Sequence, residues 1–397
     1  MAAFQVIDDK NNCFGVYADG HFEYDKIPRG HTITWNWSPH LRNSDIEYGY
    51  LFTGGKTLAE AGPPHLNERL SVREKKIKAF INSFVLAKVN IETACLYDLI
   101  PMAHLKHYLN IKNQICDYVI ENTERPQNYS FLKETYETIK EISLQPIRID
   151  WKLLEGLALK DMKASSLLKR FSGQRTFINY AMFGTRTGRL SIHEGSFPIL
   201  NIKTENKAVL MPKNDWFVEL DYNGAEIRTL LSLSGEPQPS EDIHEWNMTR
   251  FFDRVKTRDG AKKKFFGWLY NPESVNRQLE NSYDKRKVLE KYWQNGIILT
   301  PFGRRIEADD FHALNYLLQS SSSDNCMTQV NKIHRFLRNK KSNVAFVVHD
   351  SVIIDLAHDE RHLIPQIKEI FEDTRLGNFP VGVKIGRNYG QLRELSW

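Results

Sequence analysis

The longest apolar run near the end of the chain is NVAFVVHDSVIIDLA, residues 343–357. Its Val, Ile and Phe content predicts buried β-structure. Three polar residues interrupt it: His349, Asp350 and Ser351. In one interpretation they form the tight turn of a β-hairpin, with Asp350 in water. In the other, Asp350 meets a second carboxylate and metal cations, because an unpaired charge within buried structure costs several kcal/mol.

A second apolar strand is predicted for WFVELDY, which ends close to Asp221. The segment AEIRTLLSL that follows has helical spacing. An acidic residue at a strand-to-helix turn is well placed to bind a metal ion. Asp221 could instead cap the helix, which is a common role for aspartate.

A third pattern combines charge and aromatic character. In TRDGAKKKFFGWLY, the residues Arg258, Lys262, Phe266 and Tyr270 are spaced four apart. On an α-helix this spacing gives one slowly turning stripe. Cations can hold a triphosphate, and aromatic rings can stack on a base or a sugar. His244, just upstream in EDIHEWNM, is another candidate phosphate donor.

The distribution of apolar, polar, glycine and proline residues predicts that the type of structure changes along the chain. The expected segments are β-rich structure at 1–60, a linker at 59–68, polar helices at 70–145, a new unit near 146, helices at 152–183, and mixed α+β structure from 185 onward. Three polar segments in the last part carry further candidates for nucleic-acid contact: Arg186, Arg189, Asn201, Arg304, Asn315 and Gln319.

Composition narrows the class of protein. The chain has 397 residues, of which 41% are hydrophobic and 12% aromatic, enough for two or three folded domains. No apolar run approaches the ~18 residues of a membrane span, and the N-terminus lacks a signal-peptide core. We therefore expect a soluble intracellular, cytoplasmic protein.

The net charge and the cysteine spacing say less about the function of the protein than the motifs do. The net charge of +5 is mild, but basic clusters recur beside aromatic residues, as in DKRKVLEKYW. Such clusters suit a polyanion that offers bases for stacking, and solvated helix faces explain any one of them equally well. The four cysteines are far apart in the sequence and form no CxxC pair, so neither zinc nor a disulfide framework is predicted.

Taken together, the motifs resemble those of the family A DNA polymerases, the bacterial polymerase I type. DYNGAEIR resembles motif A of that family, RDGAKKKFFGWLY motif B, and VHDSV motif C. TGRLS with NIK, DIH, FGRR, LLQSSSSD and GRNYG follow in the family's order, across residues 185–390. The compact layout indicates a viral or mobile-element variant.

The resemblance implies an α+β right-hand fold, with an antiparallel palm sheet and helical fingers and thumb. The implied regions are a reduced, inactive exonuclease-like region at 1–95, the thumb and its connection at 96–184, the palm at 185–235 and 300–397, and reduced fingers at 236–299. The exonuclease-like region is expected to be inactive because VIDDKNN contains Asp8 and Asp9 but lacks the partner glutamate of that family.

The resemblance also implies the chemistry. Two Mg²⁺ ions, for which Mn²⁺ can substitute, would stabilise the attacking and leaving oxygens in phosphoryl transfer from a dNTP to a primer 3′-hydroxyl. Asp221, Asp350 and the backbone carbonyl of Tyr222 would bind them, since hard cations prefer oxygen ligands. Lys262 joins the two acids as a catalytic residue.

The resemblance also implies a role for each of the remaining motif residues. Arg258, Lys262 and His244 would bind the triphosphate, and Phe266 would pack by the sugar. Tyr270 would stack near the template base, and Glu226 together with Tyr270 would fill the space that a ribose 2′-hydroxyl needs. His349 would support the primer end. The residues expected along the primer–template are Arg186, Arg189, Asn201, Arg304, Asn315 and Gln319.

The implied partners are primer–template DNA and dNTPs, with no membrane; a helicase, a clamp or a separate exonuclease are further candidates. Two departures from the family pattern stand out, because Asn271 follows Tyr270 and Ser351 follows Asp350. Two alternatives remain open. One is a single-subunit RNA polymerase, against which Glu226 argues. The other is a degenerate polymerase kept for binding nucleic acid in a replisome.

Overall fold

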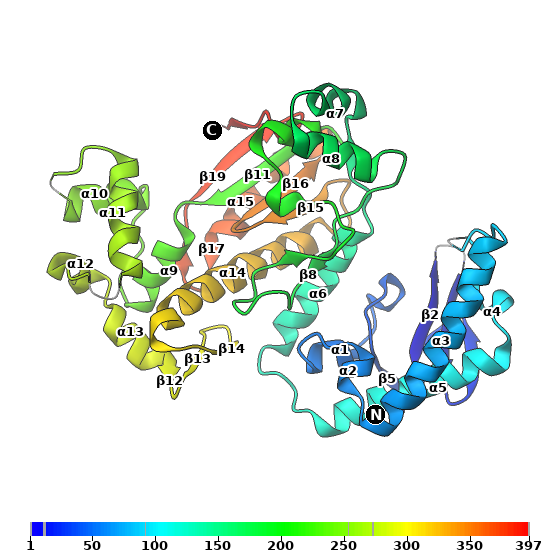
Figure 1. Cartoon of the computed structure of the whole chain (residues 1–397). Helices are drawn as coiled ribbons and strands as arrows, with labels where there is room; N and C mark the ends of the chain where they lie inside the picture. The colour runs from blue at the N-terminus through cyan, green and yellow to red at the C-terminus, as the bar shows by residue number, and fades with distance from the viewer. Residues whose placement is uncertain (1, 11–12, 92, 253, 272–273, 396–397) are drawn as a thin grey trace. The chain divides into compact units, whose positions relative to one another are not determined.

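The computed structural model describes residues 2–10, 13–91, 93–252, 254–271 and 274–395. The chain divides into two compact units, Met1–Lys140 and Glu141–Trp397 (Figure 1). The division falls in the last turn of helix α6 (Tyr129–Ser143). In the described residues, no helix has both the length and the apolar character that crossing a membrane requires.

The described part of the first unit contains two small sheets and several helices. One sheet is parallel, in the order β1 (Ala2–Ala3), β5 (His31–Thr34), β6 (Glu47–Tyr48). The other is antiparallel, in the order β2 (Gln5–Lys10), β3 (Cys13–Ala18), β4 (His21–Tyr24). The helices are η1 (Pro39–Leu41), α1 (Gly49–Phe52), α2 (Leu58–Ala61), α3 (Pro64–Leu86), α4 (Leu96–Leu99), α5 (Met102–Asn122) and most of α6.

The predicted linker at 59–68 is wrong. Helix α2 ends at Ala61, and α3 begins at Pro64 after the N-cap residue Pro63. Proline is tolerated in the first helical turn, because the backbone N–H that it lacks has no partner there. The two prolines therefore start a long helix at this point.

The first unit also extends past the predicted boundary at 95/96. Tyr17 of β3, Ile77 of α3 and Leu109 of α5 belong to one buried core. Helix α5 packs against both α3 and β3. Residues 96–140, which the resemblance assigned to the thumb and its connection, are therefore part of the same compact unit as residues 1–95.

The second unit is built on a five-stranded antiparallel sheet. Its order is β15 (Asn343–Val348), β16 (Ser351–Leu356), β11 (Trp216–Tyr222), β19 (Val381–Gly386), β20 (Arg393–Glu394). The long helix α14 (Asp310–Leu337) and α15 (Ile364–Glu372) pack against each other and against this sheet (Figure 1). The ring of Tyr222 on β11 stacks on Phe371 of α15, with ring centroids 4.2 Å apart.

Short elements complete this unit. Before the sheet come β7 (Arg148–Ile149), α7 (Trp151–Ala158), α8 (Met162–Phe171), β8 (Tyr180–Ala181), β9 (Ser191–Ile192), η2 (Ile199–Asn201), η3 (Thr204–Val209) and β10 (Leu210–Met211). After β11 come α9 (Ala225–Leu233), α10 (Ile243–Phe251), α11 (Arg258–Tyr270), α12 (Arg277–Ser282), α13 (Lys285–Tyr292), β12 (Trp293–Gln294), β13 (Ile297–Leu299) and β14 (Arg305–Glu307). The last are η4 (His358–Leu363), β17 (Asp373–Thr374) and β18 (Gly377–Asn378).

Helices α9 to α13 share an apolar core with the start of α14. Phe265 and Trp268 of α11 pack around the buried ring of Tyr283, with ring centroids 4.8 and 6.3 Å from it. Leu230 of α9 and Leu317 of α14 belong to the same core. This core fixes α11 relative to the strand-to-helix turn after β11.

Candidate active site

The hairpin predicted at the end of the chain is present and carries Asp350 at its tip. Strands β15 and β16 are antiparallel, and His349 adopts a left-handed backbone conformation with φ 55°. In the sheet register, Asp221 of β11 pairs with Ser351, the residue after Asp350. The two acids, far apart in the sequence, therefore lie at the same end of the sheet, Asp221 on β11 and Asp350 in the turn just before β16.

Asp221 does not cap the helix that follows it. The N-cap residue of α9 is Gly224, which has φ 70° and makes no side-chain cap. A Cβ there would also approach the side chain of Ile243 to 2.5 Å, so glycine is required for both reasons. The alternative interpretation of Asp221 as a capping residue is wrong, and its carboxylate faces a cavity.

A cavity of about 840 Å³ lies between the hairpin tip, α9 and α11. It brings together most of the residues predicted for catalysis, metal binding and nucleotide binding: Asp221, Tyr222, Glu226, His244, Arg258, Lys262, Phe266, His349 and Asp350, together with Arg189. These residues come from several elements and loops that are far apart in the sequence, so only the fold could bring them together.

The two acids have raised pKa values. Burial, and then the charge of Asp350, raise the pKa of Asp221 to about 7. Burial also raises the pKa of Asp350, and Glu226 adds to this, while Arg189 and His349 act in the opposite direction. Desolvation and like charges both favour the protonated carboxyl. A bound cation would reverse the balance.

The predicted stripe lies mainly on the exposed side of α11, although Phe266 also packs against the apolar core. Arg258, Lys262 and Tyr270 are exposed, whereas residues on the other side of the helix, such as Phe265, are buried. Phe266 is half-buried and stacks on Tyr270, with centroids 5.8 Å apart and an interplanar angle of 14°. The stripe thus presents two cations and two stacked rings.

Asp242 is a site residue that the sequence reasoning missed. Its Oδ2 accepts hydrogen bonds from Arg258 Nε at 3.0 Å and Arg258 Nη2 at 2.8 Å. Although burial acts to raise it, Arg258 and Asn223 lower the pKa of Asp242 to about 2. The signal was its position two residues before His244. Burial, and then Arg258, lower the pKa of His244 to about 4.

Glu226 links two other predicted residues, Arg189 and Tyr270. Its Oε1 accepts a hydrogen bond from Arg189 and its Oε2 accepts one from the Tyr270 hydroxyl. The contact joins the first turn of α9 to the last residue of α11. Both groups that the resemblance assigned to sugar selection are therefore in direct contact.

Arg304 is held inside the protein. Its guanidinium forms a bidentate ion pair with Asp324 at 3.0 and 2.7 Å, and only 13% of its side chain is exposed. It also lies against Gly188, where a Cβ would approach the guanidinium carbon to 2.3 Å. Arg304 thus packs beneath the loop that carries Arg189, and its contact with DNA stays a prediction.

The other predicted DNA-contacting residues are spread over the second unit. Arg186 and Asn201 are exposed, and Asn315 and Gln319 are half-buried on α14. Asn315 lines a second cavity of about 630 Å³ together with Tyr270 and Trp293. None of these four residues lines the cavity that holds the acids.

The sequence reasoning assigned no role to two further residues of the site region, Lys384 and Arg228. Lys384 of β19 pairs with Glu219 in the sheet register, and its ammonium lies 3.5 Å from the Glu219 carboxylate. Arg228 is fully buried and donates to the carbonyls of Asn223 and Glu241, each at 2.7 Å. It braces the loop that carries Asp242.

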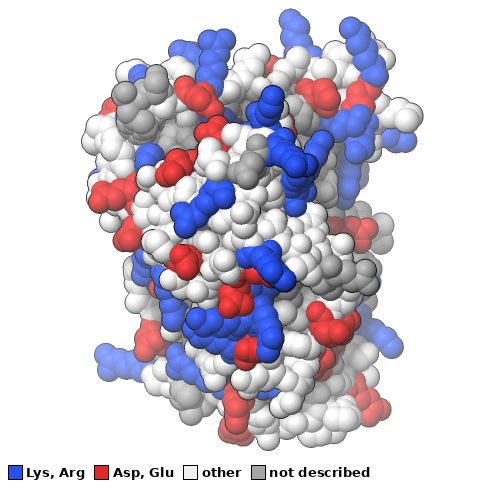
Figure 2. All heavy atoms as spheres, turned by 90° about the vertical axis from the view of Figure 1, so that its left-hand side faces the viewer, with Lys and Arg blue, Asp and Glu red and all other residues white. Residues whose placement is uncertain are grey.

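The surface over α10 to α13 carries mixed charge. Figure 2 faces the side of Figure 1 on which these helices lie, and it shows Lys and Arg interspersed with Asp and Glu. Some of these cations have internal partners, as Lys285 does, whose ammonium donates to the Trp268 carbonyl at 3.1 Å. The visible face therefore does not form one continuous basic field.

Comparison with solved structures finds a DNA polymerase domain of the same fold. The chain matches the POL domain of Pol1 from M. smegmatis, solved in complex with DNA primer-template and dNTP. The TM-score is 0.66 at 14% identity, and the match covers 98% of this chain and 95% of that one. The predicted α+β polymerase fold is confirmed, whereas the exonuclease-like region stays a prediction.

Curated relatives are DNA polymerases. The chain is 25% identical over 234 residues to the DNA polymerase of Mycobacterium phage D29, covering 46% of this chain and 35% of the relative. It is 23% identical over 278 residues to DNA polymerase I of Caldicellulosiruptor bescii, covering 56% and 33%. The chain thus spans about a third of the length of these relatives. No family model matches it. The predicted resemblance to family A DNA polymerases of phage type is confirmed.

Proposed function

We propose that the chain is a template-directed DNA polymerase that adds dNTPs to a primer 3′-hydroxyl. The observation that carries the proposal is one cavity in which two half-buried acids face a helix bearing Arg258 and Lys262. The names of its relatives, DNA polymerase and DNA polymerase I, support the same reaction. The matched POL domain of M. smegmatis was solved with DNA primer-template and dNTP, which supports the same ligands here.

The acids fit a divalent cation. Asp221 and Asp350 offer carboxylate oxygens, which hard cations such as Mg²⁺ or Mn²⁺ prefer, and the Tyr222 carbonyl adds a third oxygen. Burial and like charges raise the pKa of both carboxyls, so a bound cation would favour their ionised forms. Two bound ions would supply charge stabilisation to the attacking and leaving oxygens of the reaction.

The basic helix would hold the triphosphate. Arg258 can offer a planar, multidentate donor set, and Lys262 one turn later offers a compact charge. In the free protein Arg258 is engaged with Asp242, so the nucleotide phosphates would compete with that carboxylate. Lys262 lines the same cavity and is exposed to it, so its ammonium can meet the phosphates directly.

Phe266, Tyr270 and Glu226 would select the sugar and the base pair. The stacked rings give an apolar wall, and Glu226 stands at its end in contact with Tyr270. A 2′-hydroxyl at this position would meet a carboxylate that already accepts two hydrogen bonds. We therefore propose deoxynucleotide substrates, and this argues against the RNA polymerase alternative.

Proofreading is not part of the proposal. Residues 1–95 are proposed as an inactive exonuclease-like region, with the thumb and its connection at 96–184, the fingers at 236–299 and the palm at 185–235 and 300–397, although residues 96–140 pack in the same compact unit as residues 1–95. His349 would support the primer end, and Arg186, Arg189, Asn201, Arg304, Asn315 and Gln319 would follow the duplex. A helicase, a clamp or a separate exonuclease remain candidate partners.

The test is single-nucleotide primer extension with the full chain, Mg²⁺ and each dNTP in turn. We expect addition of the nucleotide complementary to the template and a loss of at least about 10³-fold in Asp350→Asn, since removing a metal ligand costs several kcal/mol of transition-state stabilisation. Asp359→Asn, an exposed acid paired with Lys341, is the matched control and should extend normally.

Three outcomes would contradict the proposal. Extension by Asp350→Asn at the wild-type rate would disprove the site. Equal use of rNTPs and dNTPs by the wild type would favour an RNA polymerase. Binding of primer–template without nucleotide addition would favour the degenerate, binding-only alternative.

A further inference from the structure

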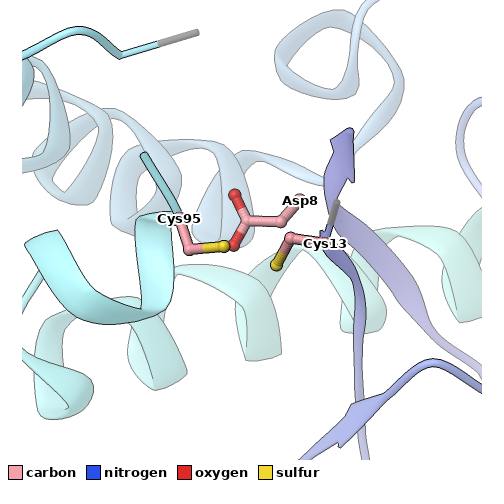
Figure 3. Close-up of side chains that lie close together, drawn as sticks. All are labelled: Asp8, Cys13 and Cys95. Atoms are coloured by element: carbon pink, nitrogen blue, oxygen red, sulfur yellow. The ribbon is translucent and has the colours of Figure 1, made fainter. Parts of the chain in front are cut away.

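A second cluster of ligand-type side chains lies in the first unit. The carboxylate of Asp8 and the thiols of Cys13 and Cys95 have ligand atoms that all lie within 4.8 Å of one another. Asp8 belongs to β2, Cys13 to β3, and Cys95 is the N-cap residue of α4. Figure 3 shows the three side chains pointing toward one another.

The hydrogen bonds of the Asp8 carboxylate do not use all of its acceptor positions. Its side chain has no exposed surface, and both oxygens lie 3.0 Å from the backbone N–H of Leu96. Lys10 is 3.7 Å from Oδ1, which is long for a hydrogen bond. The Lys10 ammonium instead donates to the carbonyls of Ile91, at 2.9 Å, and Ala94. A carboxylate has about four acceptor positions, so room for a further ligand bond remains.

We propose that Asp8, Cys13 and Cys95 bind one zinc ion. Zinc binds thiolate sulfur at about 2.3 Å and carboxylate oxygen at about 2.0–2.2 Å, so three ligand atoms on one ion lie roughly 3.3–4 Å apart in tetrahedral geometry. The observed spread requires only small movements of side chains to reach it. Two sulfur ligands favour zinc over magnesium or calcium, which prefer sets made of oxygen alone.

A disulfide explains the cluster less well. It would join Cys13 to Cys95 and leave the buried Asp8 carboxylate with only the Leu96 N–H and the Lys10 ammonium, 3.7 Å away, as partners. A zinc ion takes up the negative charge that this grouping disfavours, because metal binding displaces the thiol protons.

The ion would connect segments that are far apart in the sequence. It would join the β2–β3 hairpin to the start of α4, next to the core formed by Tyr17, Ile77 and Tyr97. In the described residues no fourth His, Cys, Asp or Glu belongs to the group, so solvent would complete a tetrahedral site. The expected consequence is a more stable first unit when zinc is bound.

The experiment uses the full chain, reduced and stripped of metal with a chelator. Zn²⁺ is titrated and counted by native mass spectrometry, and Co²⁺ is titrated as a spectroscopic probe that reports thiolate ligands through charge-transfer absorption. We expect one high-affinity Zn²⁺ per chain, competition between Zn²⁺ and Co²⁺, and a higher melting temperature with Zn²⁺. The Co²⁺ spectrum of the wild type needs no variant and remains informative if a variant fails to fold.

Variants identify the ligands. Cys13→Ser and Cys95→Ser should each weaken Zn²⁺ binding by at least about 10²-fold, and Asp8→Asn should weaken it by about tenfold while keeping an oxygen for the Leu96 N–H. Cys116→Ser is the matched control, because Cys116 is a buried cysteine of the same unit outside the cluster, hydrogen-bonded to Gln5. It should bind Zn²⁺ as the wild type does.

The proposal is overturned by any of three results. The first is that the reduced wild type takes up no Zn²⁺, and the second is that its Co²⁺ spectrum lacks thiolate bands. The third is that the double variant Cys13→Ser/Cys95→Ser retains the ion with unchanged affinity. Because primer extension is not measured, failure here leaves the proposed polymerase function untouched, and failure of that function leaves this test unaffected.

Discussion

The cavity of the second unit and the cluster of the first unit both gather side chains that can bind a metal ion, but they offer different ligand atoms. In the cavity, Asp221 and Asp350 offer only oxygen atoms, and exposed cations of α11 stand opposite. In the cluster, two sulfur atoms join one carboxylate, and the nearby Lys10 is turned toward backbone carbonyls. The first arrangement suits exchangeable hard cations and a phosphate ligand, whereas the second suits a retained zinc ion.

The buried acid Asp324 extends the comparison, because its positively charged partner is a side chain of the protein rather than a metal ion. Arg304 pairs with it in a bidentate geometry, and both side chains are largely buried. Asp324→Ala would leave Arg304 unpaired, so we expect a loss of about 3–5 kcal/mol in the free energy of unfolding. Urea denaturation at neutral pH, with and without Mg²⁺, measures it. Asp359→Ala in the exposed pair with Lys341 should change little; an equal loss there would contradict the assignment.

Lys262 tests whether the cavity binds phosphate. Lys262→Ala should lower kcat/KM for the nucleotide by roughly 10²-fold, because it removes a charge that faces the triphosphate. Steady-state primer extension over a range of dNTP concentrations measures it. The neighbouring Lys263, exposed on α11 but outside the cavity lining, gives the control Lys263→Ala, which should stay close to the wild-type value. Similar losses in both variants would indicate a general charge effect.

Asp221 should destabilise the metal-free protein at neutral pH. Its folded pKa of about 7 lies above the ordinary value of 3.8, so the folded state holds a proton that the unfolded state releases. The free energy of unfolding should therefore fall as pH rises from about 4 to about 7. At pH 8 without divalent cations, Asp221→Asn should be more stable than the wild type by on the order of 2 kcal/mol.

The same variant separates the pH effect from a general change in packing. At pH 4 the difference should vanish, because the wild-type carboxyl is then protonated and resembles the amide. Mg²⁺ should stabilise the wild type at pH 8 and leave Asp221→Asn unchanged. A stability difference that is equal at both pH values would contradict the assigned cause.

The smallest expected effect concerns sugar selection. Glu226→Ala should lower the preference for dNTPs over rNTPs by about tenfold, since it opens the space beside the sugar and removes the partner of Tyr270. Competition between a dNTP and its matching rNTP in primer extension measures it. Glu226→Gln keeps the volume and should retain most of the preference. Unchanged selectivity in Glu226→Ala would assign sugar selection to another group.

The features that could be predicted from the sequence are those that depend on the order of neighbouring residues. Asp221 ends an apolar strand, Asp350 interrupts another, and the α11 stripe follows from helical spacing alone. These features persist whichever way the rest of the chain packs. Their meeting in one cavity was implied by the family resemblance, since no local pattern fixes the order of the strands in a sheet.

What the sequence could not reveal depends on contacts between distant segments. Lys384 meets Glu219 only through the pairing of β11 with β19. The cysteines, with no CxxC pair, gave no reason to expect zinc, yet the β2–β3 hairpin and the start of α4 bring Cys13 and Cys95 together. The linker prediction failed because two prolines that end a pattern can equally begin a helix.

The central claim is that Asp221 and Asp350 jointly bind divalent cations beside the basic stripe. Mn²⁺ binding followed by electron paramagnetic resonance, in the presence of a dNTP and primer–template, tests it most directly. We predict bound Mn²⁺ in the wild type, a loss of at least about tenfold in affinity in both Asp221→Asn and Asp350→Asn, and wild-type binding in Asp359→Asn. Unchanged Mn²⁺ affinity in either cavity variant would contradict the account.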